Sequence, residues 1–373
     1  MARKRKYKKI KLSGTALVVV IILAIVIVAG YFVYTNYFKK KDPYIEAKGA
    51  ISFHFMTLGN GSSGDSIYIK AGDNDILIDA GSKKNSVDTI ENYLRQYVTD
   101  SKLEYVIVTH GDEDHIAGFA DSNGIFDRFE CGIIIDFPKT SKSLTTDSGG
   151  VSLYGSYVAK RDMEVSLGAK HYTALECYNN HNGAKREYAL SEDGNVKMQI
   201  LYNYYYENFR GEKEENDYSV CVQFVHGSRK FLFTGDLEKK GEEYLVQYND
   251  LSQVELYKAG HHGSATSSND VLMKVVKPKI CVVTCAIGDK HDFPKQDFIN
   301  RIAPYTSKVY VTTMANAEYT NGVDYVDMNG NIQIISDAKQ GVYAECSNNN
   351  TLLKDTDWFK KYRTMPEAWK IAS

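Results

Sequence analysis

His110-Gly-Asp-Glu-Asp-His115 is the stretch that decides the fold, and it directly follows the apolar run Tyr105-Val-Ile-Val-Thr109. This run is rich in β-branched residues and predicts a buried strand, so four ligand-type side chains emerge where the strand ends. Alternate side chains point the same way, so the first histidine and the first aspartate can serve one metal ion and Asp114 and His115 another. A two-metal site needs such neighbouring ligands. A solvated acidic turn is the alternative, but the residues on either side favour a metal site.

Two later motifs place further candidate ligands at strand ends. Asp236 follows the apolar run at 230–234, and the glycine between them allows a close backbone approach. The alternative role of Asp236 is to cap the helix predicted from Glu238, and one residue can do both. His261 and His262 stand between two glycines after another predicted strand, where the alternative is a polar turn. Both motifs favour a ligand set assembled from several strand ends.

Strand-like runs alternate with helical stretches from Ile51 onward, which is typical of mixed sheets packed with helices. Strands are predicted at 51–57, 66–70, 75–79, 105–109, 132–136, 197–202, 218–225, 230–234, 254–258, 279–284 and 308–311, and helices at 85–98, 151–169, 238–248, 268–276 and 294–303. Beyond residue 340 the pattern fades. We therefore expect an α/β (α+β) domain at 51–340 and a C-terminal extension at 341–373.

The N-terminal region predicts a membrane anchor. Residues 1–14 are basic, and no charged residue occurs from 15 to 34. At 1.5 Å per residue, about 20 apolar residues cross a hydrocarbon layer of about 30 Å, so 15–34 is long enough to span a membrane before a linker at 35–50. Seven Lys/Arg precede the segment and three follow it, which keeps the N-terminus cytoplasmic and the later domain extracellular. A cleaved signal peptide is the alternative.

The formal net charge of −2 hides an asymmetry, because residues 1–41 hold 10 Lys/Arg and no acidic residue. The remainder has 35 basic against 47 acidic residues. Such a domain should not bind nucleic acid through a general electrostatic field, although local basic patches remain possible. The six cysteines show no CxxC spacing, and their disulfide state is not predicted.

With these motifs the sequence resembles the metallo-β-lactamase superfamily of hydrolases, and within it the extracellular hydrolase module of ComEC-type competence proteins. The resemblance covers residues 51–335 and rests on segments in the family's order. They are Gly59-Asn-Gly-Ser-Ser-Gly-Asp65-Ser66, Ile76-Leu-Ile-Asp79-Ala-Gly81, the run from His110 to His115, Phe233-Thr-Gly-Asp236-Leu-Glu238 and Lys258-Ala-Gly-His261-His262-Gly-Ser264. It implies an αβ/βα sandwich of two mixed sheets with outer helices and a metal site at one sheet edge.

The resemblance also implies two divalent metal ions, Zn²⁺ or Mn²⁺, with a hydroxide between them as the nucleophile. The implied ligands are His110 and Asp112 for the first ion, Asp114, His115 and His261 for the second, and Asp236 as a bridge. Asp114, Asp236 and His262 would act in catalysis. The residues expected to face the substrate or to brace the ligands are Asp65, Asp79, His262 and His291, with Asp79 orienting a ligand histidine.

The sequence departs from the family pattern in two places. Asp112 stands where many members carry histidine, and an oxygen-richer site favours manganese over zinc. The usual separate histidine between the metal run and Asp236 is not evident. His171, His181 and Asp136 are the candidates for this third ligand of the first ion.

The implied activity is metal-dependent phosphoester hydrolysis, with DNA or another nucleic acid as the first substrate. One apolar segment cannot form a DNA pore, so DNA uptake is not implied. A hydrolase of cell-envelope phosphoesters of the phosphorylcholine type is the second candidate, which suits an acidic outer domain and the tyrosine cluster at 202–209. A degenerate surface binding protein is the third, and the missing third ligand is its best argument.

Overall fold

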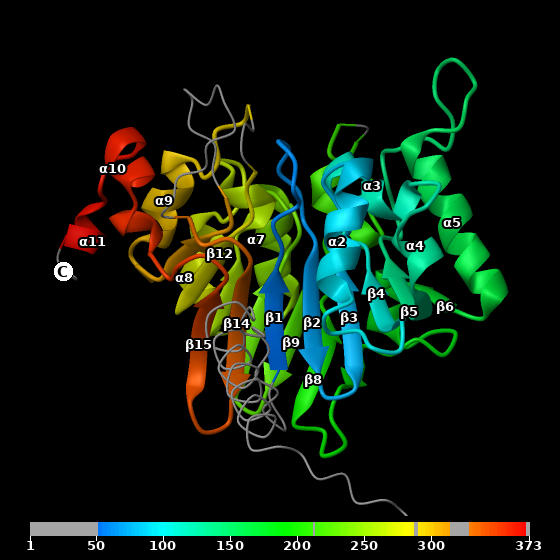
Figure 1. The fold of residues 1–373 in the computed structure, drawn as a ribbon, viewed down its shortest axis with the longest axis horizontal. Helices are drawn as coiled ribbons and strands as arrows, with labels where there is room; N and C mark the ends of the chain where they lie inside the picture. Colours follow the sequence, from blue (N-terminus) through cyan, green and yellow to red (C-terminus); the bar gives the residue numbers. More distant parts are fainter. Residues whose placement is uncertain (1–50, 212, 287–289, 314–327, 371–373) are drawn as a thin grey trace, which may run out of the picture. The chain divides into compact units, whose positions relative to one another are not determined.

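The computed structural model describes residues 51–211, 213–286, 290–313 and 328–370 (Figure 1). The predicted membrane anchor at 15–34 lies outside these ranges. Within them, every helix is too short or too polar to cross a membrane. The described residues all fall in one compact unit.

The first sheet has eight strands in the order β15-β14-β1-β2-β3-β4-β5-β6. The bounds are β1 Ile51–Phe55, β2 Ile67–Ala71, β3 Asn74–Ile78, β4 Lys102–Ile107, β5 Glu130–Asp136, β6 Lys170–Thr173, β14 Ile332–Asp337 and β15 Gly341–Cys346. Neighbours from β15 to β3 pair antiparallel, and neighbours from β3 to β6 pair parallel. The central strands β1, β2 and β3 are buried along almost their whole length, as expected of a sheet covered on both faces.

The second sheet has seven strands in the order β13-β12-β11-β10-β9-β8-β7. The bounds are β7 Glu187–Ala189, β8 Val196–Ile200, β9 Val222–His226, β10 Arg229–Phe233, β11 Leu256–Lys258, β12 Ile280–Val283 and β13 Val309–Val311. It repeats the plan of the first sheet, with antiparallel pairs from β7 to β10 and parallel pairs from β10 to β13. The two sheets face each other through aromatic rings, since Phe53 of β1 lies 4.7 Å from Phe231 and 5.4 Å from Phe233 of β10 between ring centroids.

The helices connect the strands and cover the sheets (Figure 1). The α-helices are α2 Val87–Leu94, α3 Glu113–Ala120, α4 Ile125–Arg128, α5 Leu153–Leu167, α6 Ala174–Asn179, α7 Lys239–Tyr248, α8 Asp270–Val276, α9 Gln296–Ile302, α10 Asp357–Tyr362 and α11 Glu367–Lys370, and the 3-10 turns are η2 Lys84–Ser86, η3 Tyr204–Tyr206, η4 Glu215–Tyr218, η5 Gly260–Gly263 and η6 Leu353–Asp355. One core cluster joins Leu232 and Tyr257 of the second sheet to Leu272 of α8, Phe298 of α9 and Trp358 of α10. The architecture is therefore the expected αβ/βα fold with two mixed sheets.

Several elements were not predicted. Helix α3 starts within the metal run itself, and β6, β7, β14 and β15 also escaped the sequence patterns. The stretch predicted as a C-terminal extension supplies β15 to the first sheet and buries Trp358 and Trp369. These residues thus share the core of the domain that precedes them.

Helix α3 packs against the loop after β3 through a glycine. The backbone N–H of Gly118 donates to the carbonyl of Ala80 at 2.6 Å, and a Cβ at Gly118 would lie 2.4 Å from that same oxygen. Real Cβ atoms do not come so close, so only glycine lets the helix and the loop meet. This contact fixes α3, and with it the second half of the metal run, against the first sheet.

We therefore expect Gly118→Ala to lower the free energy of unfolding by about 1–3 kcal/mol, the usual cost of overpacking. Urea unfolding followed by circular dichroism measures it. Gly150→Ala is the matched control, because the nearest atom to its added Cβ is Thr146 Oγ1 at 3.4 Å. Equal stability of the two variants would contradict the proposed role of the contact.

Candidate metal centre

The candidate residues converge because each follows the carboxyl end of a parallel strand. Asp79 follows β3, His110 follows β4, Asp236 follows β10, and His261 and His262 follow β11. Side chains at the carboxyl ends of neighbouring parallel strands share one edge of a sheet. Here both sheets contribute, so the site lies where the two edges meet.

Four side chains form a compact cluster. Asp114, His115, Asp236 and His262 each offer one ligand atom, and these atoms all lie within 4.8 Å of one another. Asp236 Oδ2 lies 3.2 Å from His115 Nε2 and 3.6 Å from His262 Nε2, and Asp114 Oδ2 lies 3.7 Å from His262 Nε2. Ligands about 2.1 Å from a tetrahedral ion lie about 3.4 Å from one another. The spacing of the cluster therefore fits one divalent metal ion.

Four buried polar atoms at the site support this fit. The Nε2 atoms of His110, His115 and His262 and the Oδ1 atom of Asp236 are buried and have no hydrogen-bond partner. A buried polar atom left in this state costs about 1–3 kcal/mol. Their number in one place indicates a site built for a cation.

The hydrogen-bond partners orient the two clustered histidines as metal ligands. His115 Nδ1 donates to Asp79 Oδ2 at 2.8 Å, and His262 Nδ1 donates to the carbonyl oxygen of Thr284 at 3.1 Å. Since these acceptors place the proton on Nδ1, the lone pair of each Nε2 atom points into the cluster. The structure thus shows the contact expected for Asp79, which also accepts hydrogen bonds from the N–H and the hydroxyl of Thr109, both at 2.7 Å.

The charges of the cluster favour binding of a cation and make it depend on pH. Burial alone would lower the pKa of His115, but the carboxylates of Asp236 and Asp79 raise that pKa well above its usual range. Burial alone would raise the pKa of Asp236, but His115 and His262 hold it well below its usual range. A divalent ion must therefore displace a proton from His115.

Asp65 lies behind His262 and is neutralised by a lysine. Asp65 Oδ1 accepts a hydrogen bond from the Thr284 hydroxyl at 2.5 Å and lies 3.4 Å from His262 Nδ1. Asp65 Oδ2 lies 2.7 Å from Lys258 Nζ, and both side chains are almost completely buried. Burial opposes ionisation of this carboxyl, yet Lys258 and His262 hold the pKa of Asp65 below its usual range. Asp65 therefore contacts His262 from outside the four-residue cluster, and the bracing role that the resemblance implies for it stays a prediction.

The two adjacent histidines occupy places opposite to those predicted. His262 is buried in the cluster, whereas the side chain of His261 is 25% exposed and its Nε2 lies 3.8 Å from Asp236 Oδ2. His261 Nδ1 lies 3.6 Å from Glu238 Oε1 at the edge of the site. Both residues have a left-handed backbone, with φ of 48° and 53°, which turns the second side chain inward. The geometry favours His262 as the ligand and His261 as the group that faces the substrate.

The residues predicted to bind the first ion do not form a complete group of ligands. Asp112 Oδ2 lies 3.5 Å from His110 Nε2, and the other oxygen of this carboxylate forms an ion pair with Lys142. Among the residues that the structure describes, neither His110 nor Asp112 belongs to a group of three ligand-type side chains.

None of the three candidates for the third ligand joins the site. His171 Nε2 lies 2.7 Å from Asp136 Oδ1, and the other oxygen of Asp136 binds Arg161 at 2.8 Å and the hydroxyl of Tyr157 at 2.9 Å. These contacts satisfy the polar groups of His171 and Asp136 outside the four-residue cluster. His181 is exposed on the surface.

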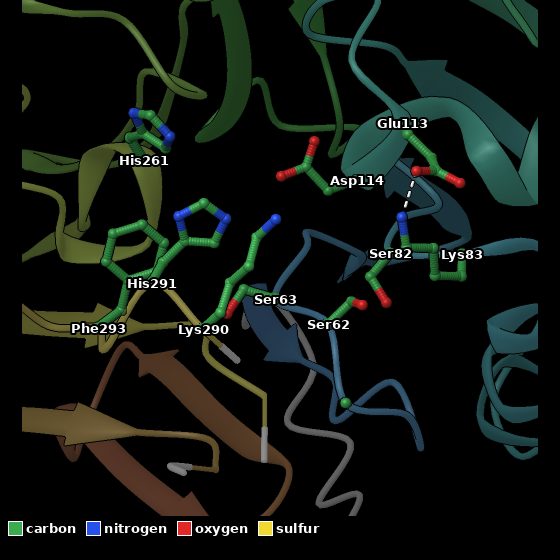
Figure 2. Close-up of a pocket in the computed structure, with 11 residues that line it drawn as sticks. Ser62, Ser63, Ser82, Lys83, Glu113, Asp114, His261, Lys290, His291 and Phe293 are labelled. Carbon is green, nitrogen blue, oxygen red and sulfur yellow. Dashed lines mark hydrogen bonds and ion pairs between the residues drawn. The ribbon is translucent and has the colours of Figure 1, made fainter. Parts of the chain in front are cut away.

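A pocket of about 430 Å³ opens beside the cluster (Figure 2). Asp114 and His261 reach it from the metal centre, and Lys290 and His291 line it from the loop after β12. Its lining residues are Gly61, Ser62, Ser63, Ser82, Lys83, Glu113, Asp114, His261, Lys290, His291 and Phe293. The ring of His291 stacks on Phe293 at 5.4 Å between centroids, and its place beside a substrate stays a prediction.

Sequence reasoning missed η4 and the serine that follows it, which contact residues of the site. Ser219 Oγ accepts a hydrogen bond from the N–H of Asp236 at 3.1 Å and lies 3.4 Å from His110 Nδ1. Asn216 Nδ2 lies 3.4 Å from His261 Nδ1. The signal was the polar stretch at 214–217 directly before the strand predicted at 218–225, together with the serine near the start of that strand.

Comparisons with known proteins agree with this site. The profile described as Metallo-beta-lactamase superfamily matches residues 59–123. Competence protein ComA of Neisseria gonorrhoeae is 32% identical over 105 residues, which are 28% of this chain and 15% of that protein. ComE operon protein 3 of Bacillus subtilis is 22% identical over 211 residues, which are 57% of this chain and 24% of that protein. This chain therefore spans less than a quarter of the length of either relative.

Among solved structures, the metallo-beta-lactamase fold protein YhfI from Bacillus subtilis is similar over 70% of this chain and 95% of its own, with 11% identity and a TM-score of 0.42. The matched profile segment contains the metal run, and the two competence proteins show distant sequence similarity. Residues 59–123 thus carry the sequence pattern of the metallo-β-lactamase superfamily, and the chain has distant similarity to the two competence proteins.

Proposed function

We propose that this metallo-β-lactamase fold hydrolase cleaves phosphoesters, with a nucleic-acid phosphodiester as the first substrate. The observation that carries the proposal is the cluster of Asp114, His115, Asp236 and His262, because Asp114 also lines a pocket that contains lysine and serine side chains. A bound divalent ion would acidify water and polarise a phosphoryl oxygen.

The pocket itself suits an anionic group. Lys290 supplies positive charge, and Ser62, Ser63 and Ser82 supply hydroxyl groups to the same pocket (Figure 2). Phosphate oxygens accept strong hydrogen bonds from such donors. His261, which reaches both the pocket and Asp236, is placed to exchange a proton with a leaving group.

Nucleic acid is the first substrate because the similar proteins carry the names of competence and recombination proteins. A small envelope phosphoester of the phosphorylcholine type is the second candidate. Its support is the pocket volume of about 430 Å³, since sites of about 300–1,000 Å³ hold small molecules. A degenerate binding protein is disfavoured by the four-residue cluster.

We also propose the cellular setting that the N-terminal sequence predicts. Residues 15–34 would anchor the protein in the cell membrane with the basic tail at 1–14 in the cytoplasm. The catalytic domain would then meet its substrate outside the cell.

The first test compares Asp236→Asn with Asp79→Asn. Loss of a residue that hydrogen-bonds to a metal ligand weakens metal binding by about 10–100-fold. Asp79→Asn should therefore weaken metal binding by this factor, and Asp236→Asn should weaken metal binding further. The full chain in detergent, reloaded with Mn²⁺ or Zn²⁺, is assayed on bis-p-nitrophenyl phosphate, single-stranded and duplex DNA, and p-nitrophenyl phosphorylcholine. The exposed Asp250→Asn is the control. Full activity of Asp236→Asn would refute the proposed site.

Metal affinity should fall as the pH falls. Because Asp236 and Asp79 raise the pKa of His115, the ion must displace one proton, which weakens binding by about tenfold per pH unit below that pKa. Competition with a coloured chelator from pH 6 to 8.5 measures this slope. In Asp79→Asn the slope should begin at a lower pH, because one of the two carboxylates that raise the pKa is gone. A pH-independent affinity would contradict the assignment of His115.

Salt distinguishes the two substrate classes. Binding of single-stranded DNA should weaken with a slope of about −0.7 in log affinity against log salt for each phosphate contact, while turnover of a small ester should change little. Turnover is measured from 50 to 300 mM NaCl on both substrates. Hydrolysis of DNA without salt dependence, beside efficient turnover of phosphorylcholine, would favour the envelope phosphoesterase.

A further inference from the structure

The loop between β5 and α5, at 137–152, reaches the first half of the metal run. Its Lys142 forms an ion pair with Asp112, the residue predicted to bind the first ion. The side chains of Lys142 and Asp112 are 36% and 29% exposed, so the pair is open to solvent and not sealed in the core. A lysine ammonium therefore stands beside the carboxylate where the family pattern implies a metal ion.

A buried carboxylate holds this loop in place. Glu215 is 4% exposed and accepts hydrogen bonds from the N–H of Gly111 at 2.8 Å, from the Thr140 hydroxyl at 2.8 Å, and from the N–H and hydroxyl of Ser141 at 2.6 and 2.7 Å. It thus joins the metal run to the two residues before Lys142. The N–H of Lys142 in turn donates to the Thr140 hydroxyl at 3.0 Å. These bonds hold the backbone at Lys142 beside the metal run, where its ammonium reaches Asp112.

The metal run is shaped for this contact. A Cβ at Gly111 would lie 2.7 Å from Glu215 Oε1 and 3.0 Å from Lys142 Cγ. Glycine at this position is what lets the carboxylate and the lysine stem approach the run. Three groups from different parts of the chain therefore meet at one point beside Asp112.

The first position is already occupied by a cation of the chain itself. His110 Nε2 is buried without a partner and faces the Asp112 carboxylate, one of whose oxygens already binds Lys142. Catalytic metal sites usually have three protein ligands. His110, Asp112 and the unpartnered Oδ1 of Asp236, the expected bridge, would make up this number only once Lys142 no longer pairs with Asp112. The four-residue cluster, in contrast, is complete.

We propose that Lys142 takes the place of one of the two metal ions. The centre then holds one divalent ion at Asp114, His115, Asp236 and His262, and the Lys142 ammonium supplies the second positive charge for the phosphoryl group. Glu215 is the positioning residue for this lysine. The inference rests on the proposed function in that the cluster binds a metal and the substrate is an anionic phosphoester. An ammonium is a compact cation with three donors, so it can hold a phosphoryl oxygen without needing metal ligands of its own.

The test is the number of metal ions bound to each chain. The full chain in detergent is loaded with excess Mn²⁺ or Zn²⁺, freed of unbound ion by gel filtration, and its metal content is measured by mass spectrometry. We expect one ion per chain in the natural protein and two in Lys142→Met, because Asp112 and His110 lose their built-in cation. Lys160→Met is the control, since Lys160 pairs with Asp127 on the same side of the domain at 2.6 Å, and it should keep one ion.

The other outcomes overturn the inference in distinguishable ways. Two ions in the natural protein, or one ion in Lys142→Met, would show that Lys142 does not replace a metal, while the proposed hydrolysis would stand. Absence of bound metal in every variant would remove the proposed function as well. Glu215→Gln gives an independent readout: loss of a charge-assisted hydrogen bond should speed amide hydrogen exchange at 140–142 by about 10–100-fold, with the rest of the domain unchanged. Unchanged exchange there would refute the positioning role of Glu215.

Discussion

The hydrogen bonds to the buried Asp79 carboxylate are the interactions on which the centre depends. One carboxylate binds the backbone and hydroxyl of Thr109 at the end of β4 and the ring of His115 on α3, while its own backbone follows β3. It therefore fixes three elements relative to one another and sets the tautomer of a ligand. A buried carboxylate is costly unless it is fully hydrogen-bonded, so loss of any one partner would disturb the others. The positions of the metal ligands therefore depend on the Asp79 carboxylate.

The rest of the site is held by backbone conformations that ordinary residues avoid. Asp79, His261 and His262 all have positive φ, and such residues cost of order 1 kcal/mol or more each. The two sheets supply the stability that offsets this strain, through aromatic contacts such as that of Phe53 with Phe231. A rigid pair of sheets thus carries loops that would not adopt these conformations alone. The sheets provide stability and the loops carry the site, so the sheet interior is apolar while the edge carries buried charges.

The sequence predicted most of the strands and the metal run, because β-branched runs such as the one before His110 carry a strong local signal. Helix α3 was missed because the ligands in its first turn hide the helical period. β14 was missed because it pairs with β1 nearly 300 residues earlier, which no local pattern reveals. The exchange between His261 and His262 was out of reach for a different reason: the direction of each ring depends on two consecutive left-handed residues. Glu215 likewise has meaning only through loops that fold onto it.

Two lysines pair with carboxylates beside the centre, and this pairing bears on how many metal ions the site can hold. Asp65 is matched by Lys258 and Asp112 by Lys142, so these two carboxylates outside the four-residue cluster have an ammonium partner, whereas Asp79 is satisfied by Thr109 and His115. Asp114 and Asp236 lack such a partner and share the cluster with two histidines. One divalent ion balances these two carboxylates. A second ion would have to displace Lys142 from Asp112. The centre would then carry more positive charge than its carboxylates balance until a phosphate group bound. In the centre that we propose, Lys142 and Lys258 are positive charges supplied by the chain itself, and one ion at the four-residue cluster balances Asp114 and Asp236.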